Sequence, residues 1–310
     1  MTDNLPAAFS LSAEVLRARA LGLPLVALES TVITHGLPYP QNLELARQME
    51  EVVREQAAIP ATIAVLDGKI CVGLNPVQLE RLASEANMLK ISSRDFAPAL
   101  ATNRSGGTTV AATAFAAQRA GILVFATGGI GGVHRNAPFD VSADLDALSR
   151  VPILVVCTGA KAILDLPATL EKLESLGVPV VGFQTDDFPA FYSPSSGLKV
   201  SARADSPEEA ARIARAHWEL GLPSATLLVV PPPVEVALPR QEVEVAIQQA
   251  LAEAGPEIIG QAVTPYLLSK VSALTHGASL RANLSLLKNN ARVAAQVARY
   301  IYPPRHQALA

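Results

Sequence analysis

The sequence predicts a layered α/β protein with a largely parallel or mixed sheet. Short apolar segments typical of buried strands alternate with segments of helical period along most of the 310 residues. Half of the residues are hydrophobic and 17% are charged, as in a globular chain. The chain shows no internal repeat, and its proline-rich stretch at 231–239 is short enough to be a rigid loop. We therefore expect one domain over residues 1–310, with residues 1–10 as a flexible tail.

The first half of the chain begins with a strand and a helix that lead into a hairpin. Asp67-Gly68 separates two apolar segments and predicts the tight turn of this hairpin. The expected strands are 25–29, 62–66, 70–72, 88–91 and 123–126, and the expected helices are 42–56, 75–86 and 108–120.

The second half continues the alternation and then becomes helical. Ser206-Pro-Glu-Glu209 is a helix start, with serine as the N-cap, proline at the first helical position and glutamate at the third. Gly221 ends this helix. The expected strands are 153–156, 180–183 and 226–230, and the other expected helices are 167–176, 240–254, 264–274 and 279–300.

Composition and charge exclude several classes of protein. The net charge of −3 argues against a nucleic-acid-binding protein, which usually carries a basic excess. No run approaches the ~20 apolar residues that span a bilayer, so we expect no membrane partner. Cys71 and Cys157 match no zinc or redox spacing and predict buried free thiols. Because the first residues also lack the pattern of a signal peptide, a cytoplasmic location is expected.

Lys161 ends the mostly apolar run 151–161, which is typical of a buried central strand. Gly159 permits a sharp turn, and α/β sheets place ligands beyond the carboxyl ends of their strands. Partial desolvation there would lower the pKa of the lysine and give a neutral amine that attacks an electrophilic carbon. The alternative is a lysine that extends from a turn into solvent, and this is the commoner arrangement.

Two further charged residues lie at or near strand ends. Burial would raise the pKa of Glu29 and suit it to general acid catalysis, and the alternative is a carboxylate that caps a helix or pairs with an arginine. Lys90 precedes Gly106-Gly107 and a helix start, where backbone amides attract phosphate. The segment is not a P-loop, because no lysine follows the glycines. A solvated lysine is the alternative for Lys90.

The loop Gly128-Gly-Ile-Gly-Gly132 follows a strand but does not match a dinucleotide fingerprint. Its third fingerprint glycine would fall at His134, and no clear helix follows. We interpret the glycines as positions where the backbone approaches a ligand. His134 is then either a polar contact or a loop histidine with its own protein partners.

Three aspartates, Asp140, Asp144 and Asp146, lie close together in the next segment. Their oxygens suit Mg²⁺ or Mn²⁺. Alternatively, Ser142 is an N-cap and the aspartates that follow it interact with the helix dipole. The two interpretations are compatible, because a metal held mainly by water needs only one protein carboxylate.

Asn283 is a polar residue on an otherwise apolar helix face. It shares this face with Leu280, Leu284 and Leu287 at helical spacing, so it is expected to point inward. A buried amide needs a partner, and either core backbone or a ligand would supply one.

Seven segments that follow one another along the chain carry a resemblance to a known family. They are 29–40 (ESTVITHGLPYP), 90–95 (KISSRD), 106–113 (GGTTVAAT), 127–135 (TGGIGGVHR), 140–145 (DVSADL), 157–165 (CTGAKAILD) and 287–291 (LKNNA). They closely resemble the pseudouridine-5′-phosphate glycosidase family, also called the indigoidine synthase A family. The resemblance runs from about residue 10 to residue 302.

The resemblance implies a three-layer α/β/α sandwich around a mixed, largely parallel sheet, and a homotrimer. It implies reversible cleavage of the C–C glycosidic bond of pseudouridine 5′-phosphate, which gives uracil and ribose 5-phosphate in pseudouridine catabolism. Lys161 matches the nucleophile that forms an imine-type adduct with ribose C1′, and Glu29 matches the proton donor.

The resemblance also assigns binding residues. Asp140 matches the ligand of a divalent metal, usually manganese. The residues that match substrate contacts or further polar positions of the pocket are Lys90, Val110, His134, Ser142, Ala143, Asp144 and Asn283.

The chemistry explains why an amine and an acid are needed together. A carbon leaving group does not depart as a nucleoside base does, so a pair of carboxylates alone is a poor catalyst. Capture of C1′ by an amine supplies an electron sink, while an acid protonates the uracil carbon. A Schiff-base aldolase or an N-glycosidase that acts on another sugar phosphate is the alternative enzyme. A binding protein without catalysis is a further alternative, although it would need neither Glu29 nor Lys161.

Overall fold

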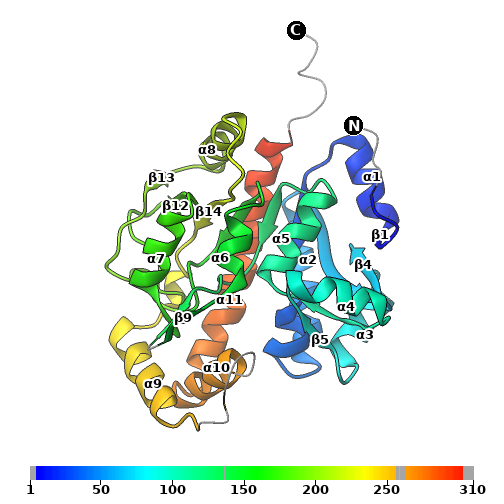
Figure 1. Ribbon diagram of the computed structural model, residues 1–310. Helices are drawn as coiled ribbons and strands as arrows, with labels where there is room; N and C mark the ends of the chain where they lie inside the picture. Colours follow the sequence, from blue (N-terminus) through cyan, green and yellow to red (C-terminus); the bar gives the residue numbers. More distant parts are fainter. Residues whose placement is uncertain (1–4, 136, 256–257, 259–262, 303–310) are drawn as a thin grey trace.

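A large mixed sheet forms the middle layer of the computed structural model, which describes residues 5–135, 137–255, 258 and 263–302 (Figure 1). Its main strand order is β1-β4-β3-β2-β7-β10-β14-β12-β13, with β6 beside β3 and β5 beside β6. The strands are β1 (Phe9–Leu11), β2 (Leu25–Leu28), β3 (Ile59–Leu66), β4 (Lys69–Val72), β5 (Leu89–Ile91), β6 (Gly106–Thr108), β7 (Val124–Ala126), β10 (Leu154–Cys157), β12 (Val180–Phe183), β13 (Ala202–Ala204) and β14 (Thr226–Val229).

The sheet is largely parallel, as the sequence predicts. Within the main sheet, as far as the structure describes it, only the pairs that β3 forms with β4 and β6 are antiparallel. The central strands are apolar and buried on both faces, which is typical of parallel strands covered by helices. Leu28, Ala126 and Val156 lie side by side in register, so the residues that follow them leave the sheet at the same edge.

Helices cover both faces of the sheet, which confirms the three-layer sandwich (Figure 1). On one face α11 packs against α2 and α8, and on the other face α5 packs against α6. The helices are α1 (Ala13–Leu21), α2 (Gln41–Glu55), α3 (Pro76–Ser84), α4 (Phe96–Ala101), α5 (Val110–Arg119), α6 (Ala143–Leu148), α7 (Leu166–Ser175), α8 (Pro207–Glu219), α9 (Arg240–Ala252), α10 (Val263–Leu274) and α11 (Ala278–Ile301).

Two smaller assemblies lie beyond one edge of the main sheet. A three-stranded sheet has the order β11-β8-β9, with β8 (Val133–His134), β9 (Ala137–Val141) and β11 (Leu164–Asp165). Helices α9 and α10 pack against each other at the same end of the molecule as β9 (Figure 1). The loop after β7 leads into β8, and the loop after β10 leads into β11.

The long predicted elements match the structure closely, and the differences concern short ones. Ser206 caps α8 by accepting a hydrogen bond from Glu209 N (3.1 Å), as predicted. The helix expected from residue 108 begins at Val110, because Thr109 is its N-cap and the preceding residues form β6. The prediction of a flexible tail is wrong for Phe9, because Phe9 of β1 pairs with Ile70 of β4. Residues 1–4 of this tail lie outside the described residues.

Both cysteines are buried free thiols, as expected. Burial raises the pKa of Cys157 to about 12, so this thiol stays protonated at neutral pH. No helix within the described part of the chain is both long and apolar enough to cross a membrane.

Candidate active site

A cavity of about 680 Å³ opens at the carboxyl ends of the central strands. Glu29 follows β2, Gly128 follows β7 and Lys161 follows β10, and these strands are neighbours in the order β2-β7-β10. Open α/β sheets place their ligands in this position. Helices α10 and α11 and the turn after β2 form the rest of the wall, with residues that include His35, Leu37, Thr264, Leu268, Ser272, Ser279, Leu280, Asn283 and Leu287.

Glu29 is the buried acid of the cavity, with 7% of its surface exposed. Its Oε2 accepts a hydrogen bond from Thr31 Oγ1 (2.8 Å), and its Oε1 accepts one from the Thr127 hydroxyl. Burial raises the pKa of this carboxyl, while Lys161 and the two hydroxyls oppose the rise. Glu29 is therefore suited to hold a proton and release it inside the cavity. Among the residues that the structure describes, Glu29 neither caps a helix nor pairs with an arginine.

Lys161 lies in the wall of the same cavity and is half-buried. Gly159 takes a left-handed conformation (φ +75°) that turns the chain after β10. Lys161 N then donates a hydrogen bond to Ile130 O (3.1 Å), which ties this turn to the glycine loop. The amine itself makes no hydrogen bond or ion pair with the described residues, so it is free to meet a substrate carbon.

Lys90 adds a second amine to the cavity. It lies on β5, where it pairs with Gly107 of β6, and its side chain is half-buried. Burial lowers its pKa first and the charge of Lys161 lowers it further, whereas Asp144 and Glu29 raise it. Lys90 thus lines the same cavity as Glu29 and Lys161.

Asp144 of α6, which is not among the residues that line the cavity, connects the first turn of α5 with the glycine loop 128–132. Its Oδ1 accepts a hydrogen bond from Ala111 N (2.9 Å) at the start of α5, and its Oδ2 accepts one from Gly131 N (2.8 Å). A protein carboxylate therefore accepts a hydrogen bond from a backbone N–H in the first turn of α5. The sequence suggested that phosphate would bind at this position. A Cβ at Gly131 would lie 2.2 Å from Ser142 Oγ, so this glycine serves a close approach to protein and not to a ligand.

Ser142 and the residues beside it have structural roles in α6. Ser142 is the N-cap of this helix and accepts a hydrogen bond from Asp144 N (3.2 Å), as the capping interpretation predicts. Ala143 opens α6, and Val110 opens α5 and is buried. The structure does not place Ser142, Ala143 or Val110 among the residues that line the cavity.

His134 and Asp140 also lie outside the cavity wall. They face each other across β8 and β9, with 3.8 Å between His134 Nδ1 and Asp140 Oδ2. Within the described ranges, no group of three or more His, Cys, Asp or Glu side chains is arranged to hold a metal ion. The Asp140 side chain is 55% exposed, so it fits only an ion that water holds for the most part.

Asn283 lines the cavity together with Leu280 and Leu287, as its helical spacing predicts. Its amide makes no hydrogen bond with the described residues. Because Asn283 is half-exposed, its amide faces the cavity without a core-backbone partner among these residues, and binding of a ligand stays a prediction.

Several residues of the site carry no role in the sequence analysis. His35 lies in the cavity wall within a π-helical turn (Val32–Gly36), and burial together with Lys90 lowers its pKa. Asn290 of α11 is fully buried and donates hydrogen bonds to Thr127 O (2.8 Å) and Gly128 O (3.3 Å). The signal that could have identified Asn290 is an amide on a helix face that is otherwise apolar.

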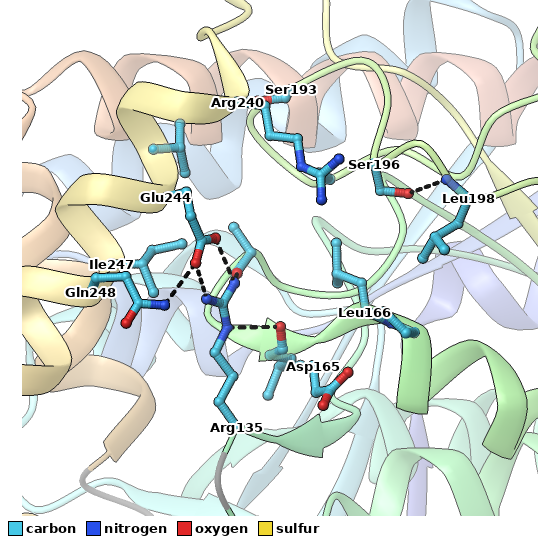
Figure 2. A pocket seen from close by; sticks show the side chains of 15 residues that line it. Arg135, Asp165, Leu166, Ser193, Ser196, Leu198, Arg240, Glu244, Ile247 and Gln248 are labelled. Atoms are coloured by element: carbon cyan, nitrogen blue, oxygen red, sulfur yellow. Dashed lines mark hydrogen bonds and ion pairs between the residues drawn. The ribbon is translucent and has the colours of Figure 1, made fainter.

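A second cavity, of about 440 Å³, borders the residues that follow Lys161 (Figure 2). Arg135 and Glu244 meet on one side of it, and the guanidinium of Arg240 extends over it from the start of α9. The other lining residues include Ala162, Leu164, Asp165, Ser193, Ser196 and Gln248. It is distinct from the cavity that contains Glu29, Lys90 and Lys161.

Comparisons with known proteins agree over nearly the whole chain. Residues 14–300 match the family model described as indigoidine synthase A like protein. The chain is 54% identical over 291 residues to a protein of Caldanaerobacter subterraneus named pseudouridine-5′-phosphate glycosidase, covering 93% of this chain and 95% of that protein. It is 56% identical over 291 residues to a protein of Herpetosiphon aurantiacus with the same name, covering 93% and 96%.

Two solved structures have the same fold. An indigoidine synthase A-like protein of Thermotoga maritima superposes with a TM-score of 0.88 at 37% identity, covering 95% of this chain and 97% of that one. The prealnumycin C-glycosynthase AlnA, solved with ribulose 5-phosphate, superposes with a TM-score of 0.89 at 41% identity, covering 96% and 98%.

Proposed function

Because this chain belongs to the indigoidine synthase A like family, we propose that it cleaves the C–C glycosidic bond of pseudouridine 5′-phosphate to give uracil and ribose 5-phosphate. The observation that carries the proposal is the meeting of Glu29, Lys90 and Lys161 in one cavity. An acid, a phosphate-neutralising cation and a free amine are the three groups that this reaction needs. The names of the relatives support the choice of substrate.

Lys161 is the proposed nucleophile. Its amine bonds to ribose C1′ as the bond from C1′ to the ring oxygen breaks, and a proton passes from the new ammonium nitrogen to that oxygen, which restores the nitrogen lone pair. The nitrogen lone pair then forms a C=N bond while the bond between C1′ and the uracil carbon breaks. Glu29 gives its proton to that carbon, and uracil leaves. Water hydrolyses the imine, which releases ribose 5-phosphate and restores the amine.

Glu29 has the environment that its step requires. Burial raises the pKa of the carboxyl, and the hydroxyls of Thr31 and Thr127 stabilise the carboxylate after the proton has left. Lys90 and Asn283 line the cavity, where Lys90 would neutralise the substrate phosphate and the Asn283 amide would bind the substrate. The solved complex of AlnA with ribulose 5-phosphate supports a pentose phosphate as the ligand class.

Three further features follow from the family resemblance and are part of the proposal. A manganese ion would be held by Asp140 and water, and when bound it would offset negative charge near the site. No step above depends on it. A homotrimer and a cytoplasmic location are expected on the same basis.

The test is to incubate the protein with pseudouridine 5′-phosphate and Mn²⁺, measure uracil release, and trap the imine with borohydride. We expect uracil release and a borohydride-stable adduct of ribose 5-phosphate at Lys161. Lys161→Ala should abolish both, while Lys172→Ala, at an exposed lysine of α7, should preserve both. Full activity of Lys161→Ala would refute the mechanism. Uracil release from uridine monophosphate instead would favour an N-glycosidase.

A further inference from the structure

The position of the Lys161 amine depends on how its main chain is held. The amine has no protein partner within the described residues, so no side-chain contact fixes it. On its N-terminal side the main chain is held by the hydrogen bond from Lys161 N to Ile130 O (3.1 Å). On its C-terminal side, Leu164 N donates to Lys161 O (3.0 Å), which closes a turn.

Arg135 holds the far side of this turn (Figure 2). It directly follows β8, and its guanidinium donates from Nη2 to Ala162 O (2.9 Å) and from Nε to Leu164 O (3.1 Å). Ala162 and Leu164 are buried, at 4% and 2% exposed, so these carbonyls would lose partners that water does not readily replace. One side chain thus fixes two carbonyls within three residues of the proposed nucleophile.

Glu244 of α9 fixes the guanidinium in turn. Arg135 Nη1 lies 2.5 Å from Glu244 Oε1, and Nη2 lies 3.0 Å from Oε2, which is a two-point pair. The Arg135 side chain is 18% exposed and that of Glu244 is 43% exposed, so the pair is partly shielded from solvent. Gln248, one turn further along α9, donates to Glu244 Oε1 (2.8 Å) and keeps the carboxylate in place.

We propose that Arg135, held by Glu244, is a positioning residue that sets the main chain of Lys161 for attack on C1′. The inference rests on the proposed role of Lys161 as the nucleophile. Attack requires the nitrogen within bonding approach of one carbon, and a displacement of about 1 Å costs about 100-fold in rate. Arginine suits this role because the N–H groups of its planar guanidinium donate to two carbonyls and a carboxylate at once. Lysine carries the same charge but presents a single donor group.

The decisive variant is Arg135→Lys, which keeps the charge opposite Glu244 and loses the carbonyl contacts. We expect kcat for uracil release to fall by about 10- to 100-fold. We expect KM to change by less than about threefold, because the substrate-binding wall is untouched. The rate of borohydride trapping with ribose 5-phosphate alone should fall with kcat. Arg81→Lys is the matched control, since Arg81 makes a two-point pair with Asp67 away from both cavities.

Chemical rescue separates positioning from general loss of structure. In Arg135→Ala, the neighbouring cavity of about 440 Å³ gives guanidinium access to the vacated position. We expect added guanidinium to raise kcat in a saturable way, and sodium at the same ionic strength to have no such effect. Glu244→Gln, at a side chain that is 43% exposed, serves if the Arg135 variants do not fold, and it should lower kcat and trapping together.

Wild-type kcat and trapping rates in Arg135→Lys would overturn the proposal. If that variant does not fold, wild-type rates in Glu244→Gln would overturn it. These outcomes differ from failure of the proposed function, in which the wild-type protein itself would release no uracil and trap no adduct.

Discussion

The Thr127 hydroxyl donates a hydrogen bond to Glu29 Oε1 and so joins the ends of the adjacent strands β2 and β7. Thr31 Oγ1 donates a hydrogen bond to the other carboxyl oxygen, Glu29 Oε2 (2.8 Å). Both bonds favour the ionised carboxylate, but burial is the larger effect and leaves the pKa of Glu29 raised. Glu29 is therefore an acid that keeps its proton to higher pH and meets two donors once the proton is gone.

The Thr127–Glu29 bond predicts a shift in the pH dependence of uracil release. In Thr127→Val, loss of the hydroxyl removes one effect that lowers the pKa of Glu29, so this pKa should rise further. The decline of kcat on the basic side should then move to higher pH. A kcat profile measured against pH checks this, with Thr102→Val, at an exposed threonine that bonds Pro98 O, as the control. A shift to lower pH would contradict the prediction.

Glu29→Gln should separate the two chemical steps. Without the proton donor, kcat for uracil release should fall by about 100- to 10,000-fold. Lys161 remains, so ribose 5-phosphate alone should still form an imine that borohydride traps. Glu50→Gln is a matched control, because Glu50 also accepts from a threonine hydroxyl, Thr62, and burial also raises its pKa, but it lies outside the cavity. Loss of both activities in Glu29→Gln would contradict separate roles for Glu29 and Lys161.

The raised pKa of Glu29 also predicts how stability changes with pH. Between 4.5, the ordinary value, and the higher pKa of the folded state, the native protein keeps a proton that the unfolded chain has lost. The contribution of Glu29 to the free energy of unfolding therefore falls as pH rises through this window.

Melting temperatures of wild type and Glu29→Gln, measured from pH 4 to pH 8, test this relation. The variant lacks the titration, so its advantage over wild type should grow with pH across the window and then level off. The melting temperature of Glu253→Gln relative to wild type should instead fall as pH rises, because Lys270 lowers the pKa of Glu253. A constant difference between wild type and Glu29→Gln would show that Glu29 does not titrate in this way.

Asn290→Ala should affect both stability and catalysis. The amide of Asn290 holds Thr127 O and Gly128 O, and its loss leaves these buried acceptors without that donor. We expect the free energy of unfolding to fall by about 1–3 kcal/mol. Because Thr127 binds Glu29, kcat should fall as well. Urea unfolding and uracil release provide the measurements, and Gln296→Ala on the same helix, which removes a side-chain bond to Gln56, is the control. Unchanged unfolding would show that Asn290 is dispensable.

The sequence predicts the catalytic groups individually, and the sheet brings them together. Glu29 and Lys161 are recognisable because each follows an apolar strand, and Lys90 because it lies near a strand end. The proximity of Glu29 and Lys161 depends on the order β2-β7-β10, and Lys90 reaches them through the pairing of β5 with β6 and of β6 with β3, so the neighbours are mostly not consecutive in the chain. Strand patterns do not specify that order, so the residues alone left each assignment open.

Other parts of the site depend on contacts that sequence patterns do not encode. No sequence pattern identifies Thr127. Its role depends on the pairing of the preceding Ala126 with Leu28, which brings Thr127 beside Glu29, and on the hydrogen bond from the distant Asn290. His134 and Asp140 were assigned by resemblance, and the structure places them outside the cavity wall. The sequence assigns no separate role to Arg135, which belongs to one of the resembling segments, because its partner Glu244 is 109 residues away along the chain.

The strand order also predicts that catalytic competence is a late event in folding. Glu29, Thr127 and Lys161 come from strands widely separated along the chain, and Asn290 joins them from the last helix. Contacts of such long sequence separation form slowly, because a large loop must close before they are made. A partly folded chain would therefore expose the lysine without the acid beside it. Recovery of uracil release during refolding should lag behind the return of helical structure, and it would report the docking of the final helix.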